Sequence, residues 1–181
     1  AVSADYDGSL RIWSYDTFAE LREIATGAAM WSLAMTPDFV FLCSPCNTKG
    51  DNCPTLFEIA TGKEVMQLEK HGRQILDLQF ANNSPLLVTC CNDSTMRVFD
   101  LRDGALVAKF VESGQGYLSG VSFSACDSVV FCGSTNKIHA VNAQTGKAIG
   151  DAVSANSHVF RIACARDNSY FVATTGTGEL F

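Results

Sequence analysis

The chain has 181 residues, of which 47% are hydrophobic and 18% charged, a composition typical of a globular domain large enough to bury a core. Its formal net charge of −6 argues against a sequence-independent nucleic-acid binder, because such a protein needs a basic surface and the 13 basic residues are scattered. Apolar runs such as FVFLC and SPLLV are far too short to span a bilayer, so no membrane insertion is expected. The first residue is not Met, and we expect it to be internal to a longer chain.

Eight cysteines are many for this length but too few for a disulfide scaffold. Cys90 and Cys132 fall in apolar, strand-like runs, where cysteine behaves as a small buried hydrophobe. We therefore predict a reduced, intracellular protein, cytoplasmic with the cytoskeleton, cilium and nucleus left open. The glycosylation triplet Asn92-Asp93-Ser94 points the other way, but such triplets are common by chance.

Short strand-like segments follow one another along the whole chain. The first are residues 1–5 (AVSAD) and 7–13 (DGSLRIW), and DTFAELREIA at 16–25 is interpreted as a turn followed by a strand. Apolar and polar residues then alternate in WSLAM (31–35), LDLQF (76–80), GVSF (120–123) and RIACA (161–165). The positions expected to point inward in these four segments are Leu33, Met35, Leu78, Phe80, Val121, Phe123, Ile162 and Cys164. No longer segment shows helical periodicity, so an all-β fold is predicted.

One phrase of this pattern recurs at a nearly fixed spacing. The aromatic position of NDSTMRVFD has counterparts in DGSLRIW, DNCPTLF, TNKIHAV and TGTGELF. The residues at this reference position are Trp13, Phe57, Phe99, Val141 and Phe181, which are 44, 42, 42 and 40 residues apart. Each period holds about four short strands, which is the signature of a four-stranded antiparallel blade of a β-propeller.

Turn residues keep the same phase as the reference position. In three copies an Asp stands six residues before it, and in three copies a Gly stands five residues after it. Asp and Gly favour tight turns, so each of these residues is predicted to shape one. The predicted structural turn residues are Asp7, Asp51, Asp93, Gly62, Gly104 and Gly146.

The repeats resemble those of the WD-repeat family of β-propellers over essentially the whole chain. DGSLRIW and NDSTMRVFD are the best matches, and VNAQTGK and FEIATGK are weaker ones. No copy keeps the Trp-Asp pair, since Trp13 is followed by Ser14 and Asp100 follows Phe99. The family's Gly-His pair before the first strand is also missing, although His71 lies near its place, as does His158. The resemblance implies that the Asp–His–Ser/Thr–Trp network bracing a typical blade cannot be complete here.

The period divides residues 1–181 into one partial WD-repeat-like propeller without a second domain. The predicted blades are 1–26 (partial), 27–69, 70–113, 114–154 and 155–181 (partial). Three full and two partial blades would leave two bare strand edges, which invite aggregation. We therefore expect a piece of a longer chain, with a seven-blade ring favoured over a five-blade ring.

The nearest approach to a metal site is Cys43-x-x-Cys46 with Cys53 seven residues later. A structural zinc needs four nitrogen or sulfur ligands, usually in two pairs, and the second pair is missing. Residues 46–53 are therefore interpreted as a lengthened hairpin turn, and no metal or cofactor is predicted.

No catalytic residue is predicted either. Neither His71, His139 nor His158 stands beside a Gly-flanked nucleophile, and TTGTGE lacks the Lys of a phosphate-binding loop. His139 is interpreted as a strand-surface residue, because Arg11 and Arg97 hold the same place in sister blades.

Phe99-Asp100-Leu101-Arg102 resembles the Trp-Asp-x-Arg box of WD-repeat proteins that act as substrate receptors of cullin-type ubiquitin ligases. In that family the Asp and Arg contact the ligase adaptor, so the resemblance implies this role for Asp100 and Arg102. The alternative is that both serve packing between blades.

A propeller without an active site offers loops for binding proteins or peptides. One face is predicted to carry the turns at Asp7-Gly8, 46–53, 92–94 and 135–136, together with loops 70–74, 112–117 and 154–158. Arg73 and Tyr117 in these loops are residue types enriched at binding hot spots. We expect a non-catalytic interaction scaffold within a larger cytoskeletal, ciliary, trafficking or signalling assembly. A ubiquitin-ligase receptor and the regulatory propeller of a larger enzyme are the alternatives.

Overall fold

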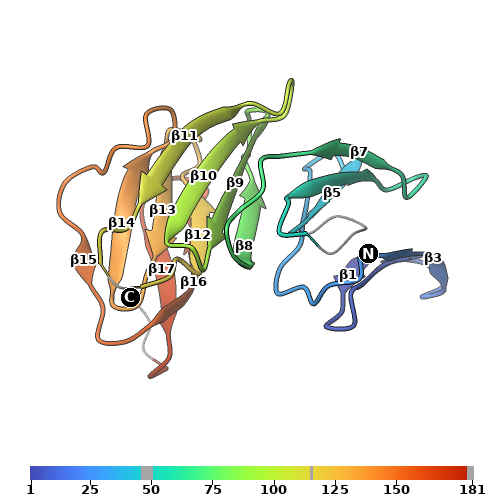
Figure 1. Ribbon diagram of the computed structural model, residues 1–181, viewed down its shortest axis with the longest axis horizontal. Coiled ribbons are helices and arrows are strands. Elements are labelled where there is room, and N and C mark those ends of the chain that lie inside the picture. Colours follow the sequence, from blue (N-terminus) through green and yellow to red (C-terminus); the bar gives the residue numbers. More distant parts are fainter. Residues whose placement is uncertain (46–50, 115, 179–181) are drawn as a thin grey trace.

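The computed structural model describes residues 1–45, 51–114 and 116–178, and every regular element within these ranges is a β-strand (Figure 1). The first sheet holds β1 (Val2–Ala4), β2 (Ser9–Trp13) and β3 (Glu20–Ala25). The second holds β4 (Ala34–Met35), β5 (Phe41–Ser44), β6 (Thr55–Glu58) and β7 (Glu64–Gln67). The third holds β8 (Ile75–Phe80), β9 (Leu86–Cys91), β10 (Thr95–Asp100) and β11 (Leu106–Val111). The fourth holds β12 (Gly120–Phe123), β13 (Val129–Gly133), β14 (Lys137–Asn142) and β15 (Val153–Ser154), and the fifth β16 (Val159–Cys164) and β17 (Phe171–Thr175).

Each of the three four-stranded sheets is an antiparallel meander in which sequential strands pair. The first strands of neighbouring sheets lie against each other, β4 against β8, β8 against β12, and β12 against β16. The sheets thus stand side by side in chain order with their first strands on the inside (Figure 1). This confirms the predicted all-β fold of four-stranded propeller blades. The segment 16–25 forms a turn and β3, as interpreted. The blade boundaries, placed within the connecting loops, stay a prediction.

The apolar core lies between the sheets. Phe57, Phe99 and Val141, at the reference position of the repeat, are fully buried, whereas Trp13 is half-buried and Phe181 lies outside the described residues. Burying one such phenylalanine contributes about 2–3 kcal/mol relative to leaving it in water. Of the positions expected to point inward, the buried ones are Leu78, Phe80, Val121, Phe123 and Ile162, and the half-buried ones Leu33, Met35 and Cys164.

Left-handed glycines close the turns after the third strand of each of the three four-stranded sheets. Gly62, Gly104 and Gly146 have φ of 70°, 75° and 68°, a region that costs residues with a Cβ about 1–2 kcal/mol. Each glycine N–H donates to the carbonyl four residues before it, at 2.7–2.9 Å. The repeated Gly therefore marks a backbone position that few other residues can take.

The predicted turn aspartates act on the backbone that follows them. Asp7 Oδ1 accepts a hydrogen bond from the Ser9 N–H, and Asp93 Oδ1 accepts one from the Thr95 N–H, both at 3.0 Å. Asp51 instead pairs with Lys70 Nζ at 2.9 Å. Asp7 holds the tight turn between β1 and β2, and Asp93 the one between β9 and β10.

Side chains also join neighbouring sheets at the turns between first and second strands. Asp127, whose φ is 60°, accepts hydrogen bonds from the N–H groups of Asn82 and Asn83 at 2.8 and 2.7 Å and from Ser84 Oγ at 3.0 Å. Asn168, with φ of 59°, accepts one from the Ala125 N–H at 2.6 Å. The left-handed residue at the tip of each of these two turns therefore reaches back to the preceding sheet.

The interpretation of His139 as a surface residue is wrong. His139 is 9% exposed, and its Nε2 lies against Glu112 Oε2 of the neighbouring sheet. Arg97, at the same place in β10, is 6% exposed and donates to Glu69 Oε1 at 2.8 Å. In these two sheets an ion pair with a neighbouring segment occupies the position, whereas the second sheet has Thr55 there. Polarity alone suggested exposure.

Candidate functional site

The turns after the second strands and the loops that lead into the first strands meet at one end of the sheets. The Asn92 N–H donates to the Gln74 carbonyl at 3.0 Å, and the Ala155 N–H to the Asn136 carbonyl at 2.8 Å. Ser94 Oγ likewise donates to the Gly116 carbonyl. We name this end the loop face. It comprises the described parts of loops 70–74, 112–117 and 154–158 and the turns that they contact.

A groove of about 280 Å³ opens where the loop face meets the first strands. Four of its lining residues are rings, Trp31, Tyr117, His158 and Phe160, and the others are Gln74, Leu76, Ser119 and Arg161. Tyr117 and Phe160 flank His158, with ring centroids 4.4 and 4.8 Å from it. We call this the aromatic groove.

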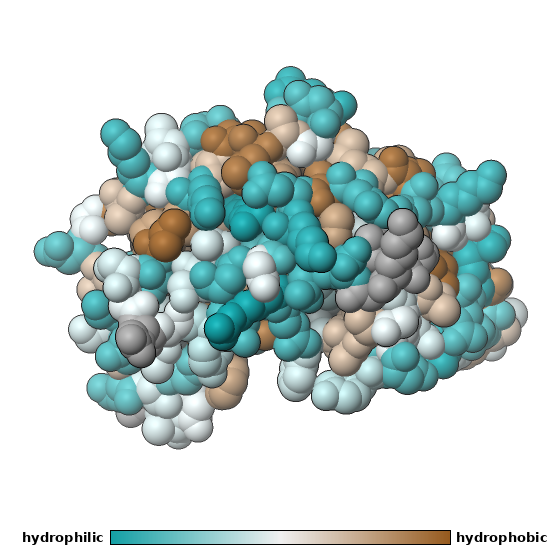
Figure 2. Space-filling model, in the orientation of Figure 1, coloured by the Kyte–Doolittle hydropathy of each residue, from teal (hydrophilic) through white to brown (hydrophobic). Residues whose placement is uncertain are grey.

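The aromatic groove is accessible. Trp31 is 53% exposed, Phe160 52% and Tyr117 37%. On the face seen in Figure 2, by comparison, apolar residues form separate patches within a mainly polar surface. Aromatic side chains that remain exposed around a concave site are a feature of binding surfaces rather than of a solvated surface.

A charged network anchors the wall of the groove. Asp77 of β8, 5% exposed, accepts hydrogen bonds from Ser32 Oγ at 2.7 Å and from the Val121 N–H at 3.2 Å, and Arg161 pairs with it. Arg161 also donates to the Trp31 carbonyl at 3.2 Å. The network therefore ties β8, β12, β16 and the segment before β4 together at the base of the groove.

The two predicted hot-spot residues lie on the loop face, and one of them lines the groove. Tyr117 forms part of its wall, whereas Arg73 is exposed in the loop beside Gln74. Their role as binding residues stays a prediction.

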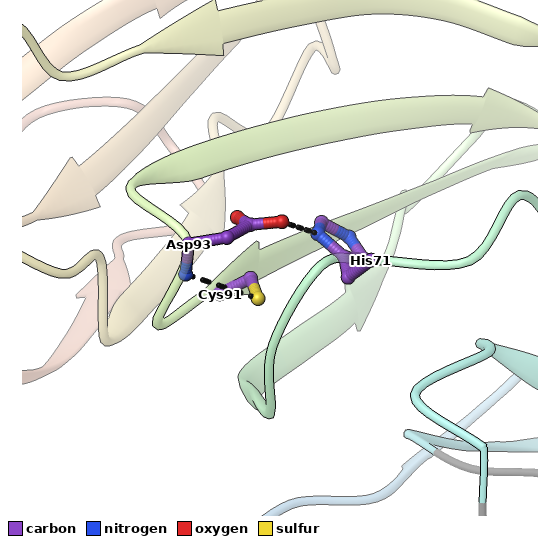
Figure 3. Close-up of side chains that lie close together, drawn as sticks. All are labelled: His71, Cys91 and Asp93. Atoms are coloured by element: carbon purple, nitrogen blue, oxygen red, sulfur yellow. Dashed lines mark hydrogen bonds and ion pairs between the residues drawn. The ribbon is translucent and has the colours of Figure 1, made fainter.

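A second cluster, partly within the loop face, consists of His71, Thr89 and Asp93. His71 Nε2 lies 2.8 Å from Thr89 Oγ1, and its Nδ1 lies 3.3 Å from Asp93 Oδ2, as Figure 3 shows for the latter. Burial above all, together with the nearby Arg97, lowers the pKa of His71 to about 4, so the ring is neutral near pH 7. Burial raises the pKa of Asp93, but hydrogen bonds from Thr95 and Gly72 outweigh it and keep the carboxyl ionised.

These contacts agree with the expectation that the network is incomplete. Three members of the Asp–His–Ser/Thr–Trp network assemble in the third sheet, while Phe99 has no N–H to supply the fourth. In the first sheet Trp13 Nε1 donates to Ser3 Oγ at 2.9 Å, and Ser3 precedes Trp13 by the ten residues that separate Thr89 from Phe99.

Cys91 completes a group of possible metal donors with His71 and Asp93, whose ligand atoms lie within 4.8 Å of one another (Figure 3). The donors are already used within the protein. His71 is bound at both nitrogens, and the Cys91 thiol donates to the Arg73 carbonyl at 3.1 Å. Burial raises the pKa of Cys91 to about 12, which disfavours the thiolate that binds metals. The group braces the loop rather than offering a metal site.

The structure describes two of the three cysteines that the sequence suggested as a metal site. Cys43 and Cys53 are buried, and the Cys53 thiol donates to the Leu68 carbonyl at 2.9 Å. Cys46 and most of the lengthened turn lie outside the described residues.

Asp100 and Arg102 lie together at the turn between β10 and β11. Arg102 Nε is 3.0 Å from Asp100 Oδ1 and 3.1 Å from Oδ2. This pairing lowers the pKa of Asp100 to about 2. The Arg102 side chain is 76% exposed and that of Asp100 14%. The guanidinium is therefore open to a partner, whereas the carboxylate is already engaged within the turn.

Comparison with known families identifies the repeat. Residues 62–100 match the family model described as WD domain, G-beta repeat. The chain therefore contains a WD repeat. That segment contains His71, Thr89 and Asp93, so the matched WD repeat includes the three residues of the bracing network in the third sheet. Proteins of this family generally mediate protein–protein interactions and are generally not catalytic.

Among curated proteins, this chain is similar to WD repeat and SOCS box-containing protein 1 of Mus musculus. The two are 34% identical over 70 residues, which cover 38% of this chain and 17% of that protein. It is also similar to U3 small nucleolar RNA-associated protein 4 homolog of Homo sapiens, 26% identical over 168 residues, covering 87% and 24%. The chain thus spans less than a quarter of the length of either relative. The computationally designed Ika8 protein superposes with a TM-score of 0.82 over 99% of this chain and 53% of its own at 21% identity, which shows the shared propeller fold alone.

The aromatic groove is what sequence reasoning missed at this site. Trp31 and Phe160 were not singled out, and His158 was considered for its place near the expected Gly-His pair and as a histidine without a neighbouring nucleophile. They stand outside the phase of the turn residues. What the sequence does show is an aromatic residue just before or at the start of the first strand in three of the sheets. Finally, the described part of the chain contains no helix that could cross a membrane.

Proposed function

We propose that this chain is a non-catalytic protein-interaction scaffold, a propeller subunit of a larger intracellular assembly, and that its aromatic groove binds a segment of a partner protein. The observation that carries the proposal is the accessible set of rings, Trp31, Tyr117 and Phe160, around one concavity on the loop face. Large aromatic side chains in a concave site supply most of the energy in many protein interfaces. Cytoskeletal, ciliary, trafficking and signalling assemblies all fit this role.

The chemistry of the groove favours a peptide with an apolar anchor beside an acidic residue. Among the described lining residues there is no carboxylate, and the side chain of Arg161, although it pairs with Asp77 at the base of the groove, is 52% exposed. Arg73 extends the positive charge along the adjoining loop. A volume of about 280 Å³ suits one or two side chains rather than a drug-sized molecule, for which pockets of about 300–1,000 Å³ are usual.

The test compares groove variants of the full-length protein with a matched control. Trp31→Ala and Tyr117→Ala should each lower the affinity for the captured partner by about 30-fold, which corresponds to the loss of about 2 kcal/mol that truncation of a hot-spot residue causes. Tyr15→Ala removes an aromatic ring that is 83% exposed and outside the groove, and should leave binding unchanged. The partners are identified by quantitative mass spectrometry of the three captures, with unchanged melting temperatures as the folding control. Partners retained equally by all variants would refute the groove as the binding site.

The second candidate is a substrate receptor of a cullin-type ubiquitin ligase. Two observations favour it: the exposed Arg102 beside Asp100, and relatives whose name includes a SOCS box. Arg102→Glu should then abolish capture of ligase adaptor and cullin subunits while the melting temperature stays unchanged. Asp103→Lys, a charge reversal in the same turn, is the control and should preserve capture. Absence of these subunits from the wild-type capture would remove this candidate.

The remaining features of the proposal concern chemistry and compartment. Among the described residues no histidine contacts an exposed serine or cysteine, which supports a non-catalytic role over a regulatory propeller with chemistry of its own. The seven described cysteines are free thiols, which supports a reducing compartment. The net charge of −6 supports protein partners without direct nucleic-acid contact, even though one relative is named for an association with RNA.

A further inference from the structure

Two cysteines from neighbouring sheets line one cleft at the end of the molecule opposite the loop face. Cys126 lies in the turn between β12 and β13, and Cys164 ends β16. The cleft has a volume of about 520 Å³, and the apolar residues Phe131, Tyr170 and Phe171 form much of its wall. The other five described cysteines are buried, whereas Cys126 is exposed and Cys164 half-buried.

Contacts between the two segments place Cys164 beside the turn that carries Cys126. The Cys164 N–H donates to Ser122 Oγ at 3.2 Å, and the Cys164 thiol interacts with the backbone of Ala125, the residue before Cys126. The Ala125 N–H is in turn held by Asn168 at 2.6 Å. The turn that carries Cys126 is therefore fixed against the end of β16.

The surroundings of the two thiols differ. Cys126 Sγ lies 2.9 Å from Ser128 Oγ and 3.5 Å from Ser124 Oγ. Hydrogen bonds, from Ser128 above all, lower the pKa of Cys126 to about 7, so much of it is thiolate at neutral pH. Burial raises the pKa of Cys164, and the nearby Asp167 raises it further. Thiolate character and exposure decide which cysteine reacts first with an oxidant.

From this geometry we propose that Cys126 is a peroxide-reactive thiol and that Cys164 resolves it as an inter-sheet disulfide. In the first step the Cys126 thiolate attacks one oxygen of hydrogen peroxide. The S–O bond forms, the O–O bond breaks, and the second oxygen leaves as hydroxide, which takes up a proton to give water. Sulfur loses two electrons and peroxide gains them. In the second step the Cys164 sulfur attacks Cys126, the S–S bond forms, the S–O bond breaks, and hydroxide leaves with the Cys164 proton as water.

The resulting disulfide joins the β12–β13 turn to the end of β16 and closes the cleft between two sheets. Because neither cysteine lies on the loop face, this inference is independent of the proposed binding function. A dithiol reductant reverses the reaction.

The test treats the full-length protein with hydrogen peroxide at pH 7, alkylates the remaining thiols and maps the peptides by mass spectrometry. We expect a Cys126–Cys164 disulfide within one molecule, while the buried Cys43, Cys90 and Cys132 stay reduced. Cys164→Ser should instead accumulate the sulfenic acid of Cys126, trapped by dimedone. Ser128→Ala should move the midpoint of Cys126 alkylation by iodoacetamide up by about one pH unit.

Three results would overturn the proposal. The first is alkylation of Cys126 at pH 7 no faster than that of the buried cysteines, against an expected excess of at least about tenfold. The second is a disulfide that joins Cys126 to a second molecule. The third is sulfenic acid at Cys126 of the wild-type chain that never proceeds to the disulfide with Cys164. Because Cys126 is exposed, Cys126→Ser should fold normally and serve as the blank for every step.

Discussion

Replacing Asp127 by asparagine should loosen the contact between the third and fourth sheets. The carboxylate is 6% exposed and accepts two backbone N–H groups and one hydroxyl from residues 82–84. Asparagine keeps the shape and tolerates the left-handed backbone at this position, but its NH₂ group must face donors. Hydrogen bonds to a charged group contribute about 1.5–3 kcal/mol each. Because asparagine keeps one acceptor oxygen, the unfolding free energy should fall by about 2–3 kcal/mol.

Urea unfolding of the full chain at pH 7 measures this loss as a lower midpoint with an unchanged slope. Asp38→Asn is the matched control, because Asp38 is exposed in the corresponding turn of the second sheet and accepts the Val40 N–H within that turn. It should change stability by less than about 0.5 kcal/mol. Equal effects of the two substitutions would refute the idea that Asp127 clamps neighbouring sheets.

The same residue predicts a dependence on pH. Burial raises the pKa of Asp127, but the hydrogen bonds from Asn82, Asn83 and Ser84 together lower it below its ordinary value. A carboxyl with a lowered folded pKa stabilises the fold above its unfolded pKa of about 3.9, and the contribution is lost as the pH falls through the folded pKa. The difference in unfolding free energy between wild type and Asp127→Asn should therefore be constant from pH 7 to about 5 and shrink below about pH 4. A difference that grows on acidification would contradict the assignment.

Three further predictions concern backbone strain and the His71 network. Gly146→Ala should lower the melting temperature more than Gly150→Ala does. Both glycines have positive φ, 68° and 67°, but a Cβ at position 146 would meet the Lys109 backbone, whereas nothing lies within 4 Å of one at position 150. Thr89→Val should lower the unfolding free energy by about 1–3 kcal/mol, because it leaves His71 Nε2 buried without a partner. Burial lowers the pKa of His71 to about 4, so unfolding takes up a proton between about pH 6.5 and 4. The unfolding free energy of the wild type should therefore fall as the pH is lowered through that range, and that of His71→Gln should fall less. Parallel plots of unfolding free energy against pH for the two proteins would contradict this.

The repeat and the sheets could be predicted because they depend on local sequence. Alternation of apolar residues and the 40–44-residue spacing of the reference position are visible without any contact information, and Phe57, Phe99 and Val141 are buried as that spacing predicts. The Gly turns follow from the same phase, since a backbone with positive φ strongly favours Gly.

What could not be predicted depends on pairing across the chain. Asp127 finds its partners 43–45 residues away, and Thr89 meets His71 across 18 residues. Aspartate is common in turns and threonine is common in strands, so neither residue type indicates a distant partner. His139 was misinterpreted for the same reason, since only the fold places Glu112 beside it. The aromatic groove draws Trp31, Tyr117 and Phe160 from segments of three different repeats, and no spacing within one repeat reveals it.

The most direct test of the account is site-specific photo-crosslinking in the native cell. A photoreactive amino acid replaces Tyr117 in the groove or, as the matched control, Tyr15 outside it, and crosslinked proteins are identified by mass spectrometry. The account predicts a discrete partner, crosslinked from position 117 and not from position 15, whose crosslinked peptide carries an apolar residue beside an acidic one. The same partner crosslinked equally from both positions, or from position 15 alone, would contradict the central claim that the loop-face groove binds it.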